Sequence, residues 1–91
     1  MDKAKQEELV KQALKEIPYL RGLHHSNGEF KKWKNNALRM LESAYGPESK
    51  EYRRFANATG THFVVRTESG LEQDYLWQLE CYEDALKSLV N

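Results

Sequence analysis

Three histidines and a single cysteine raise the question of a metal site: His24, His25, His62 and Cys81. His24 and His25 are neighbours, and on a helix neighbouring side chains point about 100° apart, which makes a shared ion difficult. His62 and Cys81 lie far away in the sequence and match no standard ligand spacing for zinc. We therefore expect no metal site and interpret the histidines as solvent-facing loop residues.

Cys81 is the side chain with the chemistry of a strong nucleophile. It falls in a predicted helix beside Glu80, Glu83 and Asp84, and nearby negative charge disfavours the thiolate that would attack a substrate. Asp74 and Glu83 form a conceivable carboxylate pair, but acids on a helix surface are ordinarily just solvated. The sequence contains no serine elbow, phosphate-binding loop or dinucleotide fingerprint. We expect no catalytic residue and no cofactor.

The basic residues of segment 30–54 are candidates for contact with nucleic acid. This segment holds seven Lys or Arg against three Glu, although the whole chain balances fourteen basic with fourteen acidic residues. On a helix, a polar basic face that suits phosphate groups gathers opposite Trp33, formed by Lys31, Lys32, Asn35 and Arg39. Such faces are also common as solubilising surfaces, and the balanced total weighs against a dedicated nucleic-acid binder. The contacts predicted for this alternative are Lys31, Lys32, Arg39, Arg53 and Arg54.

Trp77 is the most informative residue of the predicted last helix. If Tyr75 belongs to the buried face, the indole projects about 200° away from that face. Large aromatic side chains on a surface are enriched where partners dock. We predict a contact surface for a protein partner at Trp77, Cys81 and Asp84. The alternative interpretation is that the indole covers residues 61–67 of the same chain.

Apolar residues at steps of three and four predict four amphipathic helices. Pro18 ends the first, because the residue before a proline is pushed out of the helical region. Gly46 is the expected left-handed cap of the second, whose apolar stripe places Trp33 in the core. The four ranges are about 3–17, about 27–45, a shorter helix from Pro47 to about 56, and about 69–91.

The sequence also predicts how two of these helices begin and what the connections between helices look like. Ser26 with Glu29, and Ser69 with Glu72, match the capping-box pattern. The connection over residues 18–28 is expected to be held to the core by three apolar side chains, Tyr19, Leu20 and Leu23. Residues 61–67 are rich in β-branched and aromatic types, which favours an extended segment.

These elements predict one all-α domain over residues 1–91, a compact four-helix bundle with one short extended connector at about residues 58–67. The longest apolar run is residues 63–65, so no membrane contact is expected. The N-terminus lacks the apolar stretch of a signal peptide, and a single cysteine fits a reducing compartment. We expect a cytoplasmic location. The last helix has no stop signal, which suggests a piece of a longer chain.

One run of residues resembles the helical N-terminal region of many bacterial proteins of defence or prophage type. It comprises Phe30-x-x-Trp33-Lys34, then Leu38 or Leu41, then Tyr45-Gly46-x-x-Ser49 and Phe55, and a later helix with Tyr75, Leu76, Leu79 and Leu86. The similarity spans roughly residues 5–90 and rests on hydrophobic and turn residues, which specify a fold more than a function. Tyr45 stands where phenylalanine is usual.

In those proteins a predicted nucleotide-binding or TIR-like domain often follows, and this chain has none. No catalytic residue is therefore carried over, and the resemblance implies an accessory module that oligomerises, senses a signal or positions an effector. Our first hypothesis is a non-catalytic helical module for protein interaction or self-association. The alternative is nucleic-acid association through the basic face of residues 31–54. A third hypothesis is a ligand pocket lined by Tyr19, His24 and His62.

Overall fold

Amphipathic stretches of the sequence form helices along most of the described chain. The structure, a computed structural model, describes residues 2–60 and 66–90. Within these residues it contains five helices and no strand: α1 (Lys3–Lys15), α2 (Ile17–Arg21), α3 (Glu29–Tyr45), α4 (Lys50–Ala56) and α5 (Glu68–Lys87). Most of the predicted extended connector, residues 61–65, lies outside the described part.

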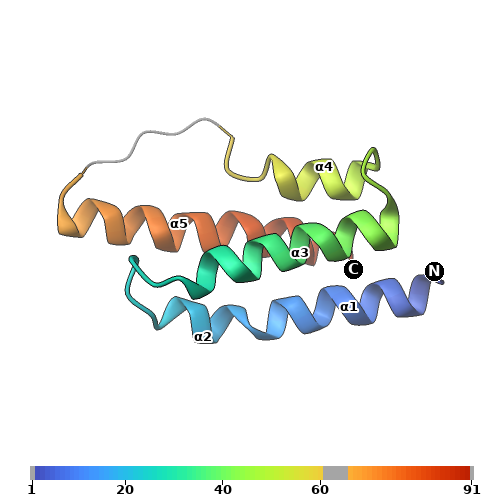
Figure 1. The fold of residues 1–91 in the computed structure, drawn as a ribbon, viewed down its shortest axis with the longest axis horizontal. Coiled ribbons are helices and arrows are strands. Elements are labelled where there is room, and N and C mark those ends of the chain that lie inside the picture. Colours follow the sequence, from blue (N-terminus) through green and yellow to red (C-terminus); the bar gives the residue numbers. More distant parts are fainter. Residues whose placement is uncertain (1, 61–65, 91) are drawn as a thin grey trace.

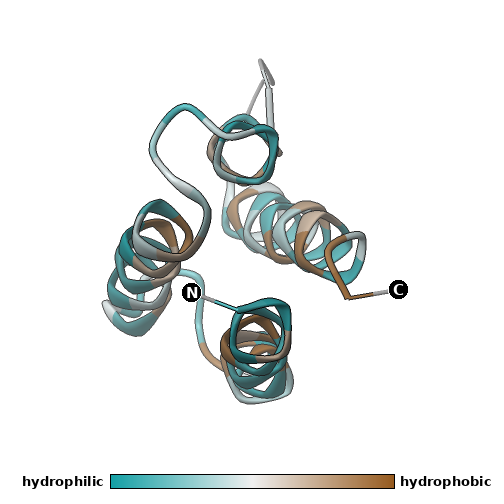
Figure 2. Cartoon of the chain, turned by 90° about the vertical axis from the view of Figure 1, so that its right-hand side faces the viewer, coloured by the Kyte–Doolittle hydropathy of each residue, from teal (hydrophilic) through white to brown (hydrophobic). Residues whose placement is uncertain are grey.

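Helices α1 and α2 lie in line and together form one leg of a bundle (Figure 1). Successive legs run in alternating directions, and α1, α3, α4 and α5 pack in a ring in which each contacts the next and α5 returns to α1. Seen along the long axis, the helices surround one interior (Figure 2). The molecule measures 44 × 25 × 22 Å. The predicted all-α four-helix bundle is confirmed, and none of the described helices is long and apolar enough to cross a membrane.

An aromatic cluster fills the interior. The side chain of Trp33 in α3 is 5% exposed, and its ring centroid lies 5.9 Å from that of Phe55 in α4 and 6.3 Å from that of Tyr82 in α5. The indole Nε1 donates a hydrogen bond of 3.1 Å to the carbonyl oxygen of Ala13, so its one polar atom is paired. Trp33 thus connects its own helix to α1, α4 and α5, and its prediction as a core residue is confirmed.

The end of the first leg differs from the prediction. We expected Pro18 to terminate the helix and residues 18–28 to be a connection. Instead α1 ends earlier, and Pro18 occupies the first turn of α2, where its missing N–H interrupts no helical hydrogen bond. Ile17 and Leu20 of α2 are buried, so the core continues past the proline. Tyr19 was expected against the core and is 63% exposed.

The side-chain caps lie one or two residues away from the predicted ones. The hydroxyl of Thr67 caps α5, where we expected Ser69. Asn27 accepts the hydrogen bond at the start of α3 that we assigned to Ser26. Ser49 caps α4, so that helix begins later than the proline-initiated helix of the prediction. Neighbouring Ser, Thr and Asn residues compete for the same role, and tertiary packing selects among them.

Two hydrogen bonds hold the turn that follows α2 against α5. The hydroxyl of Tyr75, a buried residue of α5, donates to the carbonyl oxygen of Leu20. The same hydroxyl accepts a hydrogen bond of 3.1 Å from Nδ2 of Asn27, which also donates to the carbonyl oxygen of His24. These contacts fix His24 and His25 beside the first turn of α5.

Candidate functional site

The surface around Trp77 is a groove between α2 and α5. Its volume is about 480 Å³ and its lining consists of Arg21, Gln73, Leu76, Trp77 and Glu80. Trp77 is 39% exposed and also takes part in an interaction within the chain. Arg21 is the last residue of α2 and forms an ion pair of 3.2 Å with Glu83 of α5. The groove therefore combines an apolar part with one cationic and one anionic side chain.

The three predicted partner contacts are divided between two grooves. Cys81 and Asp84 follow Trp77 along α5, but they line the groove between α4 and α5, together with Arg54 and Asn57. The lining of the Trp77 groove includes Arg21, which our sequence analysis did not single out. Arg21 belongs to α2, a helix that we expected to be a connection, so no signal in the spacing along α5 predicts its place in this groove.

Cys81 has the surroundings of an unreactive thiol. It is partly buried, and this burial raises the pKa of the thiol. The negative charges of Asp84 and Glu80 raise it further. Because the thiolate is the nucleophilic form, a raised pKa opposes nucleophilic chemistry at this position.

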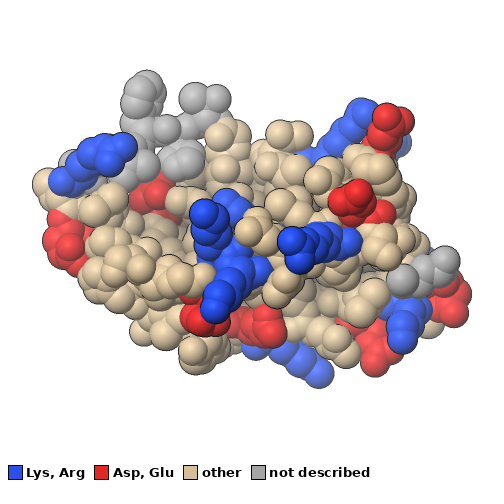
Figure 3. Space-filling view, viewed as in Figure 1, with Lys and Arg blue, Asp and Glu red and all other residues tan. Residues whose placement is uncertain are grey.

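The basic residues proposed for nucleic-acid contact are all exposed, on α3 and α4. Acidic groups accompany two of them: Lys32 forms an ion pair of 3.8 Å with Glu29, and Arg54 shares a groove with Asp84. Over the face drawn in Figure 3, lysines and arginines lie among acidic residues and do not form one continuous basic stripe. This face therefore lacks the concentrated positive charge of a dedicated phosphate-binding surface.

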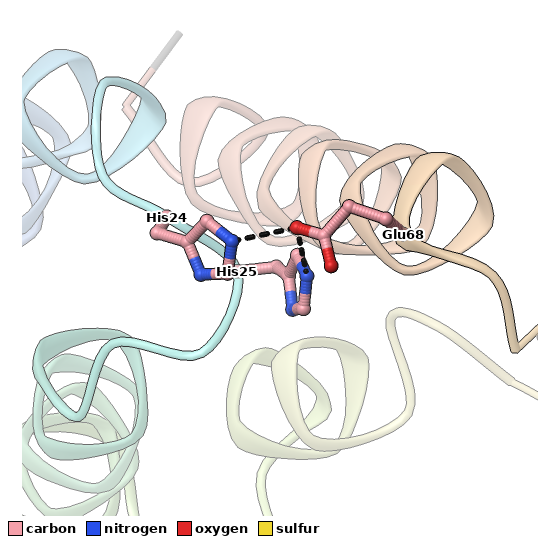
Figure 4. Close-up of side chains that lie close together, drawn as sticks. All are labelled: His24, His25 and Glu68. Atoms are coloured by element: carbon pink, nitrogen blue, oxygen red, sulfur yellow. Dashed lines mark hydrogen bonds and ion pairs between the residues drawn. The ribbon is translucent and has the colours of Figure 1, made fainter.

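The two adjacent histidines converge on one carboxylate. The Nε2 atoms of His24 and His25 lie 2.7 Å and 3.0 Å from the same oxygen, Oε1 of Glu68 (Figure 4). The hydrogen bonds from His24 and His25 lower the pKa of the Glu68 carboxyl. Nδ1 of His24 also lies 2.7 Å from the hydroxyl of Ser26.

Our reason for separating the two histidines was therefore wrong. It assumed helical spacing, whereas His24 and His25 lie in the turn between α2 and α3. The expectation that the described histidines face solvent holds for His24 but not for His25, whose side chain is only 13% exposed. Glu68 was missed because it follows His24 by 44 residues and no local spacing connects them.

The third hypothesis joined Tyr19, His24 and His62 in one pocket. Tyr19 lines a groove between the first leg and α3, together with Glu29 and Lys32. His24 belongs to the cluster at the start of α5. His62 lies outside the described residues.

The described chain thus offers an apolar groove on α5, an exposed set of basic residues and a histidine–carboxylate cluster. No family model, curated protein or solved structure matches this chain. The resemblance to proteins of defence or prophage type stays a prediction.

Proposed function

We propose that the chain is a non-catalytic helical module that associates with a second copy of itself through the groove between α2 and α5. The observation that carries the proposal is the pair Leu76 and Trp77, an apolar surface that remains partly accessible between charged neighbours. Tryptophan is the residue type most enriched among side chains that dominate binding energy. The exposed portion of the indole is the part available to a partner.

A second copy suits this groove because the groove carries both signs of charge. In a two-fold symmetric contact the same surface meets itself, so it must complement itself. Arg21 and Glu80 lie at the same apolar patch, which allows a cation of one copy to approach an anion of the other. The net charge of zero also removes long-range repulsion between two copies. Because the patch contains one partly exposed indole and few other apolar residues, we expect the association to be weak.

The alternatives have less support. Acidic groups accompany basic residues of α3 and α4, and the raised pKa of the Cys81 thiol opposes nucleophilic catalysis. An accessory role beside an effector domain, as the resemblance implies, is compatible with self-association and forms part of the same proposal.

Sedimentation equilibrium of the wild-type chain tests the proposal, at concentrations from about 10 µM to about 1 mM. The weight-average molar mass is expected to rise from 10.7 kDa toward twice that value. Trp77→Ala should weaken the association at least about tenfold, because it removes the largest side chain of the patch. Glu80→Lys, a change of an exposed residue, should weaken it as well.

Two control variants are matched to these changes. Tyr19→Ala removes an exposed aromatic residue that lines a different groove, and Glu42→Lys makes the same charge reversal on an exposed residue of α3. Both should associate like the wild type. A wild-type mass that stays at 10.7 kDa throughout would overturn the proposal, and so would equal association of the wild type, Trp77→Ala and Glu80→Lys.

A further inference from the structure

A histidine–carboxylate cluster joins the turn between α2 and α3 to the start of α5, and it is built by long-range packing. Tyr75 anchors the turn between α2 and α3 through Leu20 and Asn27, so the turn cannot drift away from α5. Glu68 is the first residue of α5, and its carboxylate reaches this turn. Figure 4 shows both imidazoles directed at the same carboxylate oxygen.

The ligand atoms of the cluster are close to the arrangement that a transition-metal ion requires. One ring nitrogen of each histidine and one oxygen of Glu68 all lie within 4.8 Å of one another. In a tetrahedral zinc site, bonds of about 2.0–2.1 Å place neighbouring ligands about 3.3 Å apart. The side chains of His24 and Glu68 are 57% and 70% exposed, which leaves them room to adjust toward that spacing.

Ser26 supplies the outer partner that orients a metal-binding imidazole. Its hydroxyl lies 2.7 Å from Nδ1 of His24, and its backbone N–H donates a hydrogen bond of 3.2 Å to the same atom. When Nε2 of His24 binds a metal, the ring proton moves to Nδ1 and is donated to the Ser26 hydroxyl, and the hydrogen bond from the Ser26 backbone N–H to Nδ1 is given up. The mostly buried His25 is held in place by its surroundings, so the cluster has one fixed imidazole and two adjustable ligands.

We propose that His24, His25 and Glu68 bind one divalent transition-metal ion, with Zn²⁺ as the representative. Two imidazoles and one carboxylate are ligands that Zn²⁺ accepts, and the fourth position is open to water. The bound ion cross-links the turn after α2 to the start of α5. It therefore stabilises the folded chain over the unfolded chain, in which Glu68 is far from the two histidines.

Calorimetric titration of the tag-free chain with ZnCl₂ tests the proposal, at about pH 7.5 where free imidazole is mostly neutral. The expected result is one ion per chain, together with a rise in the unfolding temperature when Zn²⁺ is present. Ca²⁺ and Mg²⁺ prefer oxygen ligands and should cause no such rise. The Glu80→Lys variant should bind Zn²⁺ like the wild type, which separates this site from self-association.

Variants of the two exposed ligands locate the ion. His24→Ala and Glu68→Gln should each weaken Zn²⁺ binding at least about tenfold, a loss expected when one of three ligands is removed. Ser26→Ala should weaken it less, because it removes only the outer hydrogen bond. Glu72→Gln, one helical turn from Glu68, and Cys81→Ser are the controls and should bind like the wild type.

Three results would overturn the site. The first is no heat of binding and no change in unfolding temperature with Zn²⁺. The second is binding that is equally strong in the wild type, His24→Ala and Glu68→Gln, which would place the ion elsewhere. The third is one ion per two chains, since the three ligands proposed come from a single chain.

Discussion

At the scale of single residues, the two tryptophans show how a position on a helix decides what a side chain does. Trp33 falls in the apolar stripe of α3 and packs against Phe55 and Tyr82. Trp77 lies two residues beyond the buried Tyr75 on α5 and keeps 39% of its surface exposed. The same residue type therefore stabilises the interior in one place and offers an apolar contact in the other.

Trp33→Ala should lower the free energy of unfolding by about 3–5 kcal/mol, because it leaves a cavity among buried aromatic rings. Urea denaturation followed by circular dichroism measures this change. Tyr19→Ala is the control, and its effect should stay within about 0.5 kcal/mol, as for an ordinary surface residue. A loss below about 1 kcal/mol for Trp33→Ala would show that the aromatic cluster does not support the fold.

Cys81 should react slowly with iodoacetamide in the folded chain. Its raised pKa means that at any pH below that value less of the thiol is ionised than in an unstructured chain. The pH dependence of alkylation should therefore have its midpoint at a higher pH in the native protein than in the urea-unfolded protein. Coincident midpoints, or faster alkylation of the native chain, would contradict the burial of this thiol.

At the scale of the elements, periodicity predicted which stretches are helical, and packing decided where they begin and end. The apolar stripe of α3 and the apolar seam of α5 could be predicted from the sequence, because each helix buries one continuous face. The starts were shifted because Thr67 and Asn27 compete successfully with Ser69 and Ser26 as caps. The short helix α2 was missed because its burial depends on contacts with α1 and α5 rather than on its own sequence.

Gly46 gives the sharpest test of a helix end. Its backbone, at φ 101° and ψ 150°, occupies a region that side chains with a Cβ rarely adopt. Gly46→Ala should destabilise the chain by about 1–3 kcal/mol, although no atom lies within 4 Å of the added Cβ. Thermal and urea unfolding measure the change.

Gly28→Ala is the matched control, because Gly28 also has open space around it but has an ordinary φ of −86°. It should be neutral or stabilise the chain by up to about 1 kcal/mol, since alanine restricts the unfolded state. Equal effects of the two substitutions would mean that backbone strain does not determine the end of α3.

At the scale of the whole molecule, both candidate sites arise from contacts between segments that are distant in the sequence. The groove requires Arg21 of α2 beside Glu80 of α5, and the cluster requires His24 beside Glu68. The sequence predicted the bundle and the outward direction of Trp77. It could not predict these pairings, because adjacent histidines in a turn and an acid 44 residues away have no shared periodicity.

The fluorescence of Trp77 tests the central claim, self-association through this groove, most directly. In a Trp33→Phe background, which keeps an aromatic ring in the core, Trp77 is the only remaining tryptophan. Its emission should shift to shorter wavelength as the chain concentration rises, because association removes water from the indole. The midpoint of this shift should fall at the same chain concentration as the midpoint of association found by sedimentation. An emission maximum that stays constant over the whole concentration range would contradict the claim.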